Sequence, residues 1–254
     1  MEIPLSILQG NSLFTSFATF DGNAPLFELH CKRLISSVGE TYLGNKFDFE
    51  TLYASFFKEI NWKHEFQEKP NHYFRLTIYP ELSHVRDVRI SDLKMIYHNH
   101  ERREKKDSVS LVTVESPYSE SYKALKAGSY FQIKYLQYSH LEKEEEDILL
   151  ISKNKILEAS TSCVVFQKGN TFYTPKSAQI LESISLKGFV KFCLELNLDL
   201  EFKELELDSI HSFDHAFVLN SISLMRGVSR INNHSYMENK ELIKSFNHYY
   251  KRIG

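Results

Sequence analysis

The feature that most constrains the fold is a series of four short apolar runs between residues 148 and 173. Polar turns separate the runs, among them Lys-Asn-Lys at 153–155 and Lys-Gly-Asn at 168–170. Short apolar runs bounded by turn residues are typical of β-strands. The second half of the chain is therefore predicted to open with a meander of strands.

The first half of the chain alternates between strand and helix periodicity. Residues 13–20 are rich in Phe and Thr and end at an Asp-Gly turn at 21–22, which predicts a strand followed by a tight turn. Apolar residues recur at three- and four-residue intervals across 27–38 and 49–60, which predicts two amphipathic helices. Residues 73–79 alternate with period two, which predicts another strand.

The rest of the chain adds elements of both kinds. A charged run at residues 98–107 is predicted to be a solvated loop between two strands. Apolar residues recur with helical spacing in three further segments, and four further segments show the pattern of a strand. The helices are expected at 130–141, 185–196 and 238–252, and the strands within 85–96, 109–114, 200–207 and 216–221.

Strands and helices mixed in two blocks indicate an α+β (α/β) fold with two lobes. The chain has 254 residues, which is enough for two domains of ordinary size. A short polar stretch at residues 116–119 lies near the division. We expect an N-terminal α/β lobe at residues 1–112 and a C-terminal lobe at residues 113–254.

Composition argues against several classes of protein. The formal net charge is −2, so no overall positive field would draw the chain to nucleic acid or to an anionic membrane. The longest apolar runs are strand-sized, and no basic segment precedes an apolar one at the N-terminus. The three cysteines are far apart and lack zinc-site spacing, which favours a reducing, cytoplasmic location and no bound metal.

The common nucleotide-binding and hydrolase motifs do not occur in the sequence. It contains no G-x-G-x-x-G fingerprint, no P-loop and no G-x-S-x-G string. Chemistry driven by a nucleotide or by a serine nucleophile at a strand-to-helix elbow therefore has no support.

Six local strings go further than composition and periodicity do. They are residues 13–22, 28–34, 158–166, 173–175, 180–185 and 217–225. The first two carry a Phe-Thr-Ser strand and a His-x-x-Arg-Leu helix, and the third begins with Glu158. In this order the strings resemble the class IV (fold-type IV) pyridoxal phosphate enzymes, which comprise aminotransferases and 4-amino-4-deoxychorismate lyases.

The resemblance implies a complete architecture for the chain. It implies an N-terminal α/β sandwich and a C-terminal, pseudo-barrel-like lobe that binds pyridoxal 5'-phosphate. It also implies a homodimer that acts on a small-molecule amino substrate. The chain departs from the family pattern at Cys163, where asparagine is common, and at Ala159, where glycine is common.

The resemblance also implies a role for each of seven residues. Lys126 is the lysine that binds the cofactor aldehyde and moves protons, and the residues after it fit the family better than those after Lys123. Glu158 pairs with the pyridine nitrogen and keeps the ring electron-withdrawing. The phosphate donors are Arg33, Ile184, Ser185 and Ser221, and the donor to the ring oxygen is Tyr130.

Each of these residues also has an ordinary structural explanation. Lys126 at a helix start could be solvated, and Ser185 could be a helix N-cap. Glu158 could be an outward residue of a half-exposed sheet. Their occurrence together, in the order and spacing of the family, favours the site.

The lyase and the aminotransferase differ at Ser16. Aminotransferases of this family commonly carry glutamate and glycine after the first strand's Phe, whereas this chain has Thr15 and Ser16, as the lyase does. A hydroxyl there can relay a proton, so the first hypothesis is β-elimination of pyruvate from 4-amino-4-deoxychorismate, giving 4-aminobenzoate for folate synthesis. The alternative is an aminotransferase for a branched-chain or D-amino acid, with Tyr73 and Arg75 binding its carboxylate. A third hypothesis is a binding protein without catalysis, against which the presence of all the candidate residues counts.

Overall fold

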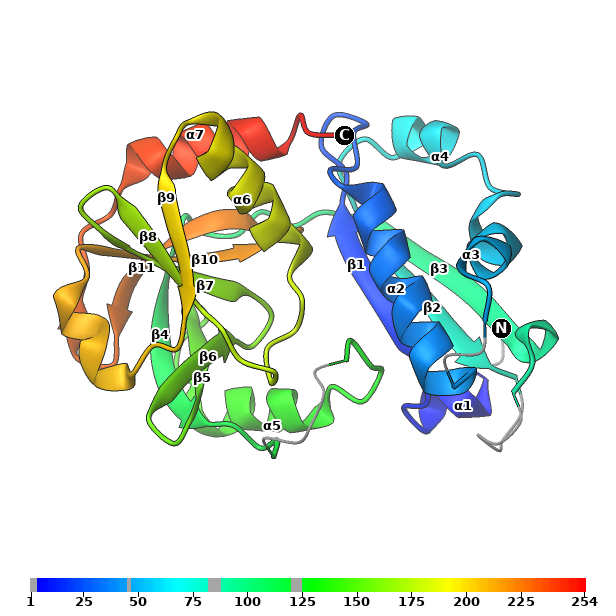
Figure 1. Cartoon of the computed structure of the whole chain (residues 1–254), viewed down its shortest axis with the longest axis horizontal. Coiled ribbons are helices and arrows are strands. Elements are labelled where there is room, and N and C mark those ends of the chain that lie inside the picture. The colour runs from blue at the N-terminus through cyan, green and yellow to red at the C-terminus, as the bar shows by residue number, and fades with distance from the viewer. Residues whose placement is uncertain (1–3, 45–46, 82–87, 120–124) are drawn as a thin grey trace. The chain divides into compact units, whose positions relative to one another are not determined.

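The computed structural model describes residues 4–44, 47–81, 88–119 and 125–254 (Figure 1). It divides the chain into two compact units. The N-terminal unit comprises residues 1–103 and 125–130, together with the last residue, and the C-terminal unit comprises residues 104–124 and 131–253. The segment that contains Lys126 therefore belongs to the N-terminal unit, although the chain on either side of it belongs to the other.

The N-terminal unit is a three-stranded antiparallel sheet, in the order β1-β2-β3, with four helices. Its strands are β1 (Leu13–Ala18), β2 (His72–Pro80) and β3 (Leu93–Glu101). Its helices are α1 (Leu5–Leu8), α2 (Phe27–Tyr42), α3 (Phe49–Phe57) and α4 (Trp62–Glu68). The predicted apolar stripe of α2 is buried, because the helix packs along β1 over a core that includes Phe17, Ile35 and Phe74.

The alternation of side chains along β1 separates two neighbouring hydroxyl residues. Leu13 and Phe17 belong to the core of the N-terminal unit, so Thr15, between them, faces the same side as they do. Ser16 faces the other side, where its partner across the strand pair is Arg75 of β2. The sheet thus gives Thr15 and Ser16 different environments.

The C-terminal unit contains a mixed nine-stranded sheet, and Figure 1 shows its strands curling around a common interior. The strands on its main path follow the order β6-β5-β4-β11-β10-β7-β8-β9, and β12 pairs with β11. Their bounds are β4 (Ser108–Glu115), β5 (Glu146–Ser152), β6 (Lys155–Ala159), β7 (Cys163–Lys168), β8 (Thr171–Pro175), β9 (Asp199–Lys203), β10 (His215–Asn220), β11 (Leu224–Ile231) and β12 (His234–Ser235). The pairs β4–β5, β4–β11 and β8–β9 are parallel.

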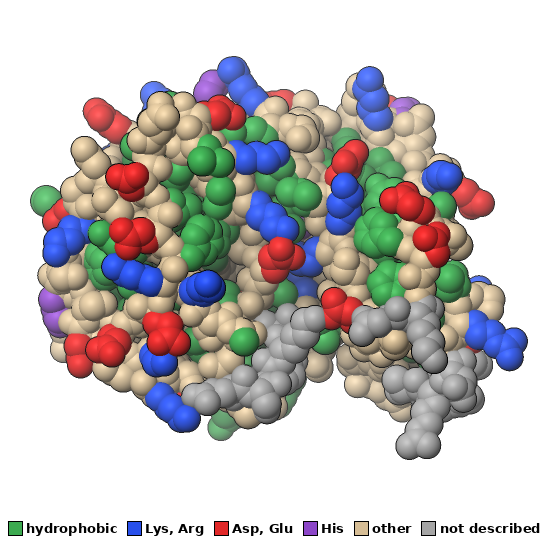
Figure 2. All heavy atoms as spheres, in the orientation of Figure 1, with side chains coloured by type: hydrophobic (Ala, Val, Ile, Leu, Met, Phe, Trp, Pro, Cys, Tyr) green, Lys and Arg blue, Asp and Glu red, His purple; other side chains and the backbone are tan. Residues whose placement is uncertain are grey.

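Three helices accompany this sheet: α5 (Phe131–His140), α6 (Ile184–Glu195) and α7 (Lys240–Tyr250). Helix α5 lies beside β4 and β5, whereas α6 and α7 pack against each other. Phe189 and Phe192 of α6 contact Phe246 of α7 edge to face. Charged side chains of both signs are interspersed over the visible surface (Figure 2), in keeping with the small net charge.

The structure confirms the mixed α+β class and most of the predicted elements, and it adds α1, α4 and β12, which were not predicted. The charged run 98–107 is wrong as a continuous loop, because residues 98–101 extend β3 and pair with β2. Strand β11 was not predicted, and it follows β10 after a turn at residues 221–223. The predicted domain boundary between residues 112 and 113 lies within β4.

Candidate active site

The backbone of Lys126 is tied directly to β1. The amide of Phe14 donates to the carbonyl of Lys126 at 2.8 Å, and Ala127 forms an antiparallel bridge with Leu13. The amide of Gly128 donates to the carbonyl of Ser12 at 2.7 Å, which extends the pairing. A segment from the middle of the chain is therefore held at the edge of the N-terminal sheet, and this pairing fixes the position of the Lys126 backbone.

The Phe14 ring lies among the predicted cofactor and substrate residues of the N-terminal unit. The Nζ atom of Lys126 is 5.0 Å from the centre of this ring, and Cζ of Arg75 is 3.7 Å from it. The Tyr130 ring meets the same ring edge-on, with centres 5.8 Å apart. The face of an aromatic ring attracts cations, so Phe14 helps to hold both basic side chains.

Arg33 and His30 meet at the Thr15 hydroxyl, on the α2 side of the sheet. Nη2 of Arg33 donates to Oγ1 of Thr15 at 3.0 Å, and Nδ1 of His30 is 2.9 Å from the same oxygen. His30 is 1% exposed, and burial, followed by the charges of Arg33 and Lys126, holds its pKa well below the ordinary value. A neutral His30 and a charged Arg33 therefore share one buried hydroxyl.

The opposite face of the same sheet carries Ser16, Tyr73 and Arg75. Ser16 pairs across the strands with Arg75, and Tyr73, two residues before Arg75, shares their face. Burial raises the pKa of the Tyr73 hydroxyl above its ordinary value, and Arg75 and Ser16 oppose that shift. The His100 ring stacks on Tyr73 with ring centres 4.6 Å apart. This face offers a hydroxyl, a phenol and a guanidinium, a set that can orient a carboxylate.

In the C-terminal unit, Glu158 and the start of α6 meet around Cys163. Oε1 of Glu158 accepts from the amide of Leu181 at 3.3 Å. Burial raises the pKa of the Cys163 thiol to about 11, with Glu158 acting in the same direction and the hydroxyls of Ser183 and Ser185 opposing it. The thiol is thus a protonated, buried group, and it donates to the carbonyl of Leu219 at 3.5 Å.

Helix α6 begins at Ile184, and Ser183 is its N-cap. Oγ of Ser183 accepts from the amide of Leu186 at 3.2 Å and lies 2.9 Å from Oγ of Ser185, which is buried. The N-cap of α6 is therefore Ser183, whereas the sequence offers Ser185 as a possible N-cap. The first amides of a helix have no acceptor within the helix, and its dipole favours an anion there. The predicted phosphate donors Ile184 and Ser185 both lie in this first turn.

Ser221 follows the last residue of β10 and is also buried. Its Oγ accepts from the Tyr250 hydroxyl of α7 at 3.1 Å. Oδ1 of Asn220 accepts from the amides of Ile222 and Ser223, at 2.9 and 2.7 Å, and so shapes the turn around Ser221. The position of this serine is set by both the turn and α7.

The predicted site residues fall into two sets, one in each unit. Around β1 the structure brings together Ser16, Arg33, Tyr73, Arg75, Lys126 and Tyr130. Around Cys163 it brings together Glu158, Ile184 and Ser185, and Ser221 lies at the end of β10. Lys123, the alternative lysine, lies outside the described residues.

Sequence reasoning missed several residues that support these sets. His30 was visible in the His-x-x-Arg string but was given no role, and the alternation of β1 could have placed Thr15 beside it. Tyr250 carries no such signal, because it is 29 residues from Ser221 and only the packing of α7 brings it there.

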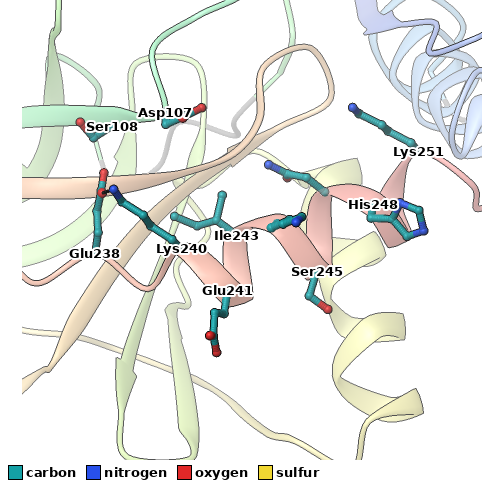
Figure 3. Close-up of a pocket in the computed structure, with 11 residues that line it drawn as sticks. Asp107, Ser108, Glu238, Lys240, Glu241, Ile243, Ser245, His248 and Lys251 are labelled. Carbon is teal, nitrogen blue, oxygen red and sulfur yellow. Dashed lines mark ion pairs between the residues drawn. The ribbon is translucent and has the colours of Figure 1, made fainter.

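Two other features of the described residues bear on the search for a site. A cavity of about 1080 Å³ runs along α7 in the C-terminal unit (Figure 3), and none of the predicted site residues lines it. Within the described ranges, no three His, Cys, Asp or Glu side chains gather in a way that could hold a metal ion. Nor does any described helix combine the length and the apolar character needed to cross a membrane.

The donor set matches the chemistry of pyridoxal phosphate. An amine suits its aldehyde, and a carboxylate suits its ring nitrogen. A guanidinium, two hydroxyls and the amides of a helix start suit its phosphate. All of these groups are present, at Lys126, Glu158, Arg33, Ser185, Ser221 and Ile184.

Comparison with known proteins supports the same assignment. The family model of amino-transferase class IV matches residues 12–231 of the chain. A Rickettsia felis protein named "Probable branched-chain-amino-acid aminotransferase" is 25% identical over 87 residues, which are 34% of this chain. That alignment spans only 30% of the relative's own length.

Solved structures share the fold over nearly the whole chain. A hypothetical aminotransferase from Mycobacterium tuberculosis, in its PLP-bound form, has a TM-score of 0.81 at 15% identity and covers 98% of this chain and 94% of its own. A 4-amino-4-deoxychorismate lyase from Pseudomonas aeruginosa has a TM-score of 0.77 at 13% identity, with 96% and 93% covered. At these identities the likeness is one of fold.

Proposed function

The chain belongs to the amino-transferase class IV family, and we propose that it is the lyase that eliminates pyruvate from 4-amino-4-deoxychorismate and leaves 4-aminobenzoate. The protein is a pyridoxal phosphate-dependent enzyme, as its family is. The observation that carries the choice of reaction is the hydroxyl of Ser16 beside Tyr73 and Arg75, on the sheet face opposite the α2 core.

Bound pyridoxal phosphate supplies an electron-withdrawing ring that stabilises negative charge on the carbon bearing the substrate amine. Glu158 holds a proton on the ring nitrogen through its negative charge. Arg33, which donates to Thr15, would bind the phosphate, and so would the free amides in the first turn of α6. Lys126 Nζ takes the proton from the amine-bearing carbon.

Elimination then requires the ring C–O bond to the three-carbon group to break, and that group to gain a proton and become pyruvate. Ser16 Oγ, beside the Tyr73 hydroxyl, relays this proton. Arg75 holds a carboxylate of the substrate while the bond breaks. Formation of the aromatic ring of 4-aminobenzoate drives the reaction.

The second candidate is an aminotransferase for a branched-chain or D-amino acid. It is favoured by Tyr73 and Arg75, which can bind an α-carboxylate as readily as a ring carboxylate, and by the likeness to the Rickettsia felis relative. In this reaction Ser16 has no proton to relay, because no leaving group departs.

The deciding experiment is to supply enzymatically generated 4-amino-4-deoxychorismate to the purified, cofactor-loaded protein and to measure release of 4-aminobenzoate. Turnover supports the lyase. Absence of product from a protein that retains the absorbance of bound cofactor, together with amino transfer to a 2-oxo acid, supports the aminotransferase instead.

Ser16 supplies a second test within the same protein. We expect Ser16→Ala to lower lyase turnover by a factor on the order of 10² or more, as general acid catalysis contributes, and Ser16→Thr to retain most of it. Cofactor affinity, measured by absorbance titration, should be unchanged in both variants. If Ser16→Ala keeps as much lyase activity as Ser16→Thr and wild type do, Ser16 takes no part in the reaction.

We further propose that the enzyme is a cytoplasmic homodimer that supplies 4-aminobenzoate for folate synthesis. The three cysteines, Cys31, Cys163 and Cys193, are all free and buried, which suits a reducing compartment. Sedimentation of the purified protein measures the oligomeric state.

A further inference from the structure

The guanidinium of Arg226 is buried near one end of the C-terminal sheet, and one of its nitrogens has no hydrogen-bond partner among the described residues. Arg226 lies on β11 and is 8% exposed, and the nitrogen in question is Nε. Burial lowers its pKa below the ordinary value. A buried charge that is not fully paired is costly, so such a group calls for an explanation.

Arg226 faces the interior of the curled sheet. Val228, two residues along β11, and Val218, its cross-strand partner on β10, both belong to the interior core of the C-terminal unit. Side chains at these three positions share one face. Strand β11 starts at the sheet end where β10 finishes, and Ser221 follows β10 at that same end.

The carboxylate that influences Arg226 is Asp147, and one of its two oxygens is engaged elsewhere. Oδ1 of Asp147, on β5, accepts from Nε2 of Gln137 at 3.1 Å, from Oγ of Ser160 at 2.5 Å and from the amide of Ile148 at 2.8 Å. In the part of the chain that the structure describes, no carboxylate lies within ion-pair distance of Arg226. Asp147 therefore attracts Arg226 from a distance but does not bind it.

Two lysines add to the positive charge here. The pKa of Lys105 is lowered, first by burial and then by the charge of Arg226, with Lys134 acting in the same direction and Asp147 opposing. Lys105 is therefore influenced by two cations, Arg226 and Lys134, and by one carboxylate, Asp147. Lys105 and Lys134 are themselves exposed, and their charge beside the buried guanidinium favours a bound anion.

We propose that Arg226, supported by Lys105, binds a carboxylate of the substrate at a subsite in the C-terminal unit. A guanidinium presents parallel N–H donors that match the two oxygens of a carboxylate, and Nε is one of those donors. The substrate identity rests on the proposed function, in which 4-amino-4-deoxychorismate carries two carboxylates and 4-aminobenzoate retains one. The subsite itself rests on the burial of Arg226, on its unpartnered Nε and on the lysines that add positive charge there.

The test measures binding of 4-aminobenzoate by calorimetry to the cofactor-loaded protein, with aniline as the same ring without a carboxylate. We expect wild type to bind 4-aminobenzoate more tightly than aniline, and Arg226→Met to weaken 4-aminobenzoate binding by at least ~10-fold, as loss of a charged hydrogen bond does. Arg226→Lys should give an intermediate affinity. Lys106→Met, which removes an exposed cation paired with Glu145, is the matched control and should bind as wild type does.

Two results would overturn the subsite. One is equal affinity for 4-aminobenzoate in wild type and Arg226→Met, or for 4-aminobenzoate and aniline in wild type. The other is a structural role, in which Arg226→Met unfolds while Arg226→Lys folds and binds 4-aminobenzoate with wild-type affinity. Because an unpaired buried cation does not stabilise the fold, we expect the melting temperature of Arg226→Met to equal or exceed that of wild type.

Failure of the subsite and failure of the lyase assignment are distinguishable. If wild type and Arg226→Met release 4-aminobenzoate with the same KM, the subsite is wrong and the lyase assignment is supported. If the protein releases no 4-aminobenzoate but binds it through its carboxylate, and Arg226→Met abolishes this binding, the subsite is supported and the lyase assignment is wrong.

Discussion

At the scale of single residues, the site of the N-terminal unit depends on the two faces of β1. On the core side the Thr15 hydroxyl accepts from Arg33 and lies against His30, while Ser16 shares the other face with Tyr73 and Arg75. Phe14 lies under both Arg75 and Lys126. A shift of one residue in the β1–β2 register would exchange these faces and destroy both arrangements.

The role of Lys126 can be tested by removing its amine. We expect Lys126→Ala to lose the visible absorbance of lysine-bound cofactor and all turnover, because no other described side chain at this edge of β1 carries an amine. Spectra of protein incubated with pyridoxal phosphate measure the first effect.

The matched control for Lys126 is Lys123→Ala, three residues earlier in the chain. This variant should keep both the absorbance and the turnover. Activity that survives Lys126→Ala but not Lys123→Ala would transfer the role to Lys123.

His30 predicts a dependence of stability on pH. Its pKa in the folded protein lies below the unfolded value of 6.5, so the unfolded chain binds the proton more readily. This group leaves the free energy of unfolding unchanged above about pH 6.5 and lowers it below that pH, by up to ~1.4 kcal/mol per unit. Urea unfolding at about pH 7.5 and about pH 5.5 measures the loss.

The variant His30→Asn isolates this contribution, because asparagine can meet Thr15 but does not titrate. We expect its stability to fall less between the two pH values than that of wild type. The same fall in both proteins would assign the effect to other groups.

At the scale of elements, the packing of α6 against α7 positions a predicted phosphate donor. Gly188 of α6 leaves room for the Tyr250 ring of α7, and a Cβ at position 188 would lie 2.6 Å from that ring. The Tyr250 hydroxyl in turn donates to Ser221. A small residue in one helix therefore affects a serine at the end of a strand.

Gly188→Ala is expected to destabilise the protein by about 1–3 kcal/mol, because the added methyl group overpacks the contact. Helix propensity alone predicts the opposite, a gain of about 1 kcal/mol. Lys191→Ala, at an exposed position of the same helix, should change stability by less than ~0.5 kcal/mol. Urea unfolding separates the two, and a Gly188→Ala protein as stable as wild type would contradict the packing argument.

At the scale of the whole molecule, each unit has its own buried core and its own buried thiols. Cys31 lies in the core of the N-terminal unit, whereas Cys163 and Cys193 lie in the C-terminal unit. Burial raises the pKa of Cys163 to about 11 and that of Cys193 to about 12. The thiols therefore report separately on the unfolding of the two units.

We expect all three thiols to resist a disulfide reagent in the folded protein and to react fully in denaturant, since only an exposed thiolate attacks. Mass spectrometry after labelling in increasing urea identifies which cysteine reacts first. Rapid reaction of any of the three in native buffer would contradict their burial.

The sequence by itself determined the local structure of this protein. Apolar spacing predicted α2, α3, α6 and α7, alternation predicted β2, and turn residues separated the strands between 148 and 173. These features depend on neighbours a few residues apart, which periodicity reports directly. The order of the local strings was also enough to identify the family, which the match over residues 12–231 confirms.

Only the tertiary structure decided which distant residues meet. Strand β4 lies between β5 and β11, Lys126 lies at β1, and Tyr250 lies at Ser221 because strand pairing and core burial bring them together. Arg226 appeared ordinary in the sequence and became notable only when its Nε was seen to be buried without a partner among the described residues. Burial and hydrogen bonding depend on the whole fold, so local patterns carry no signal for them.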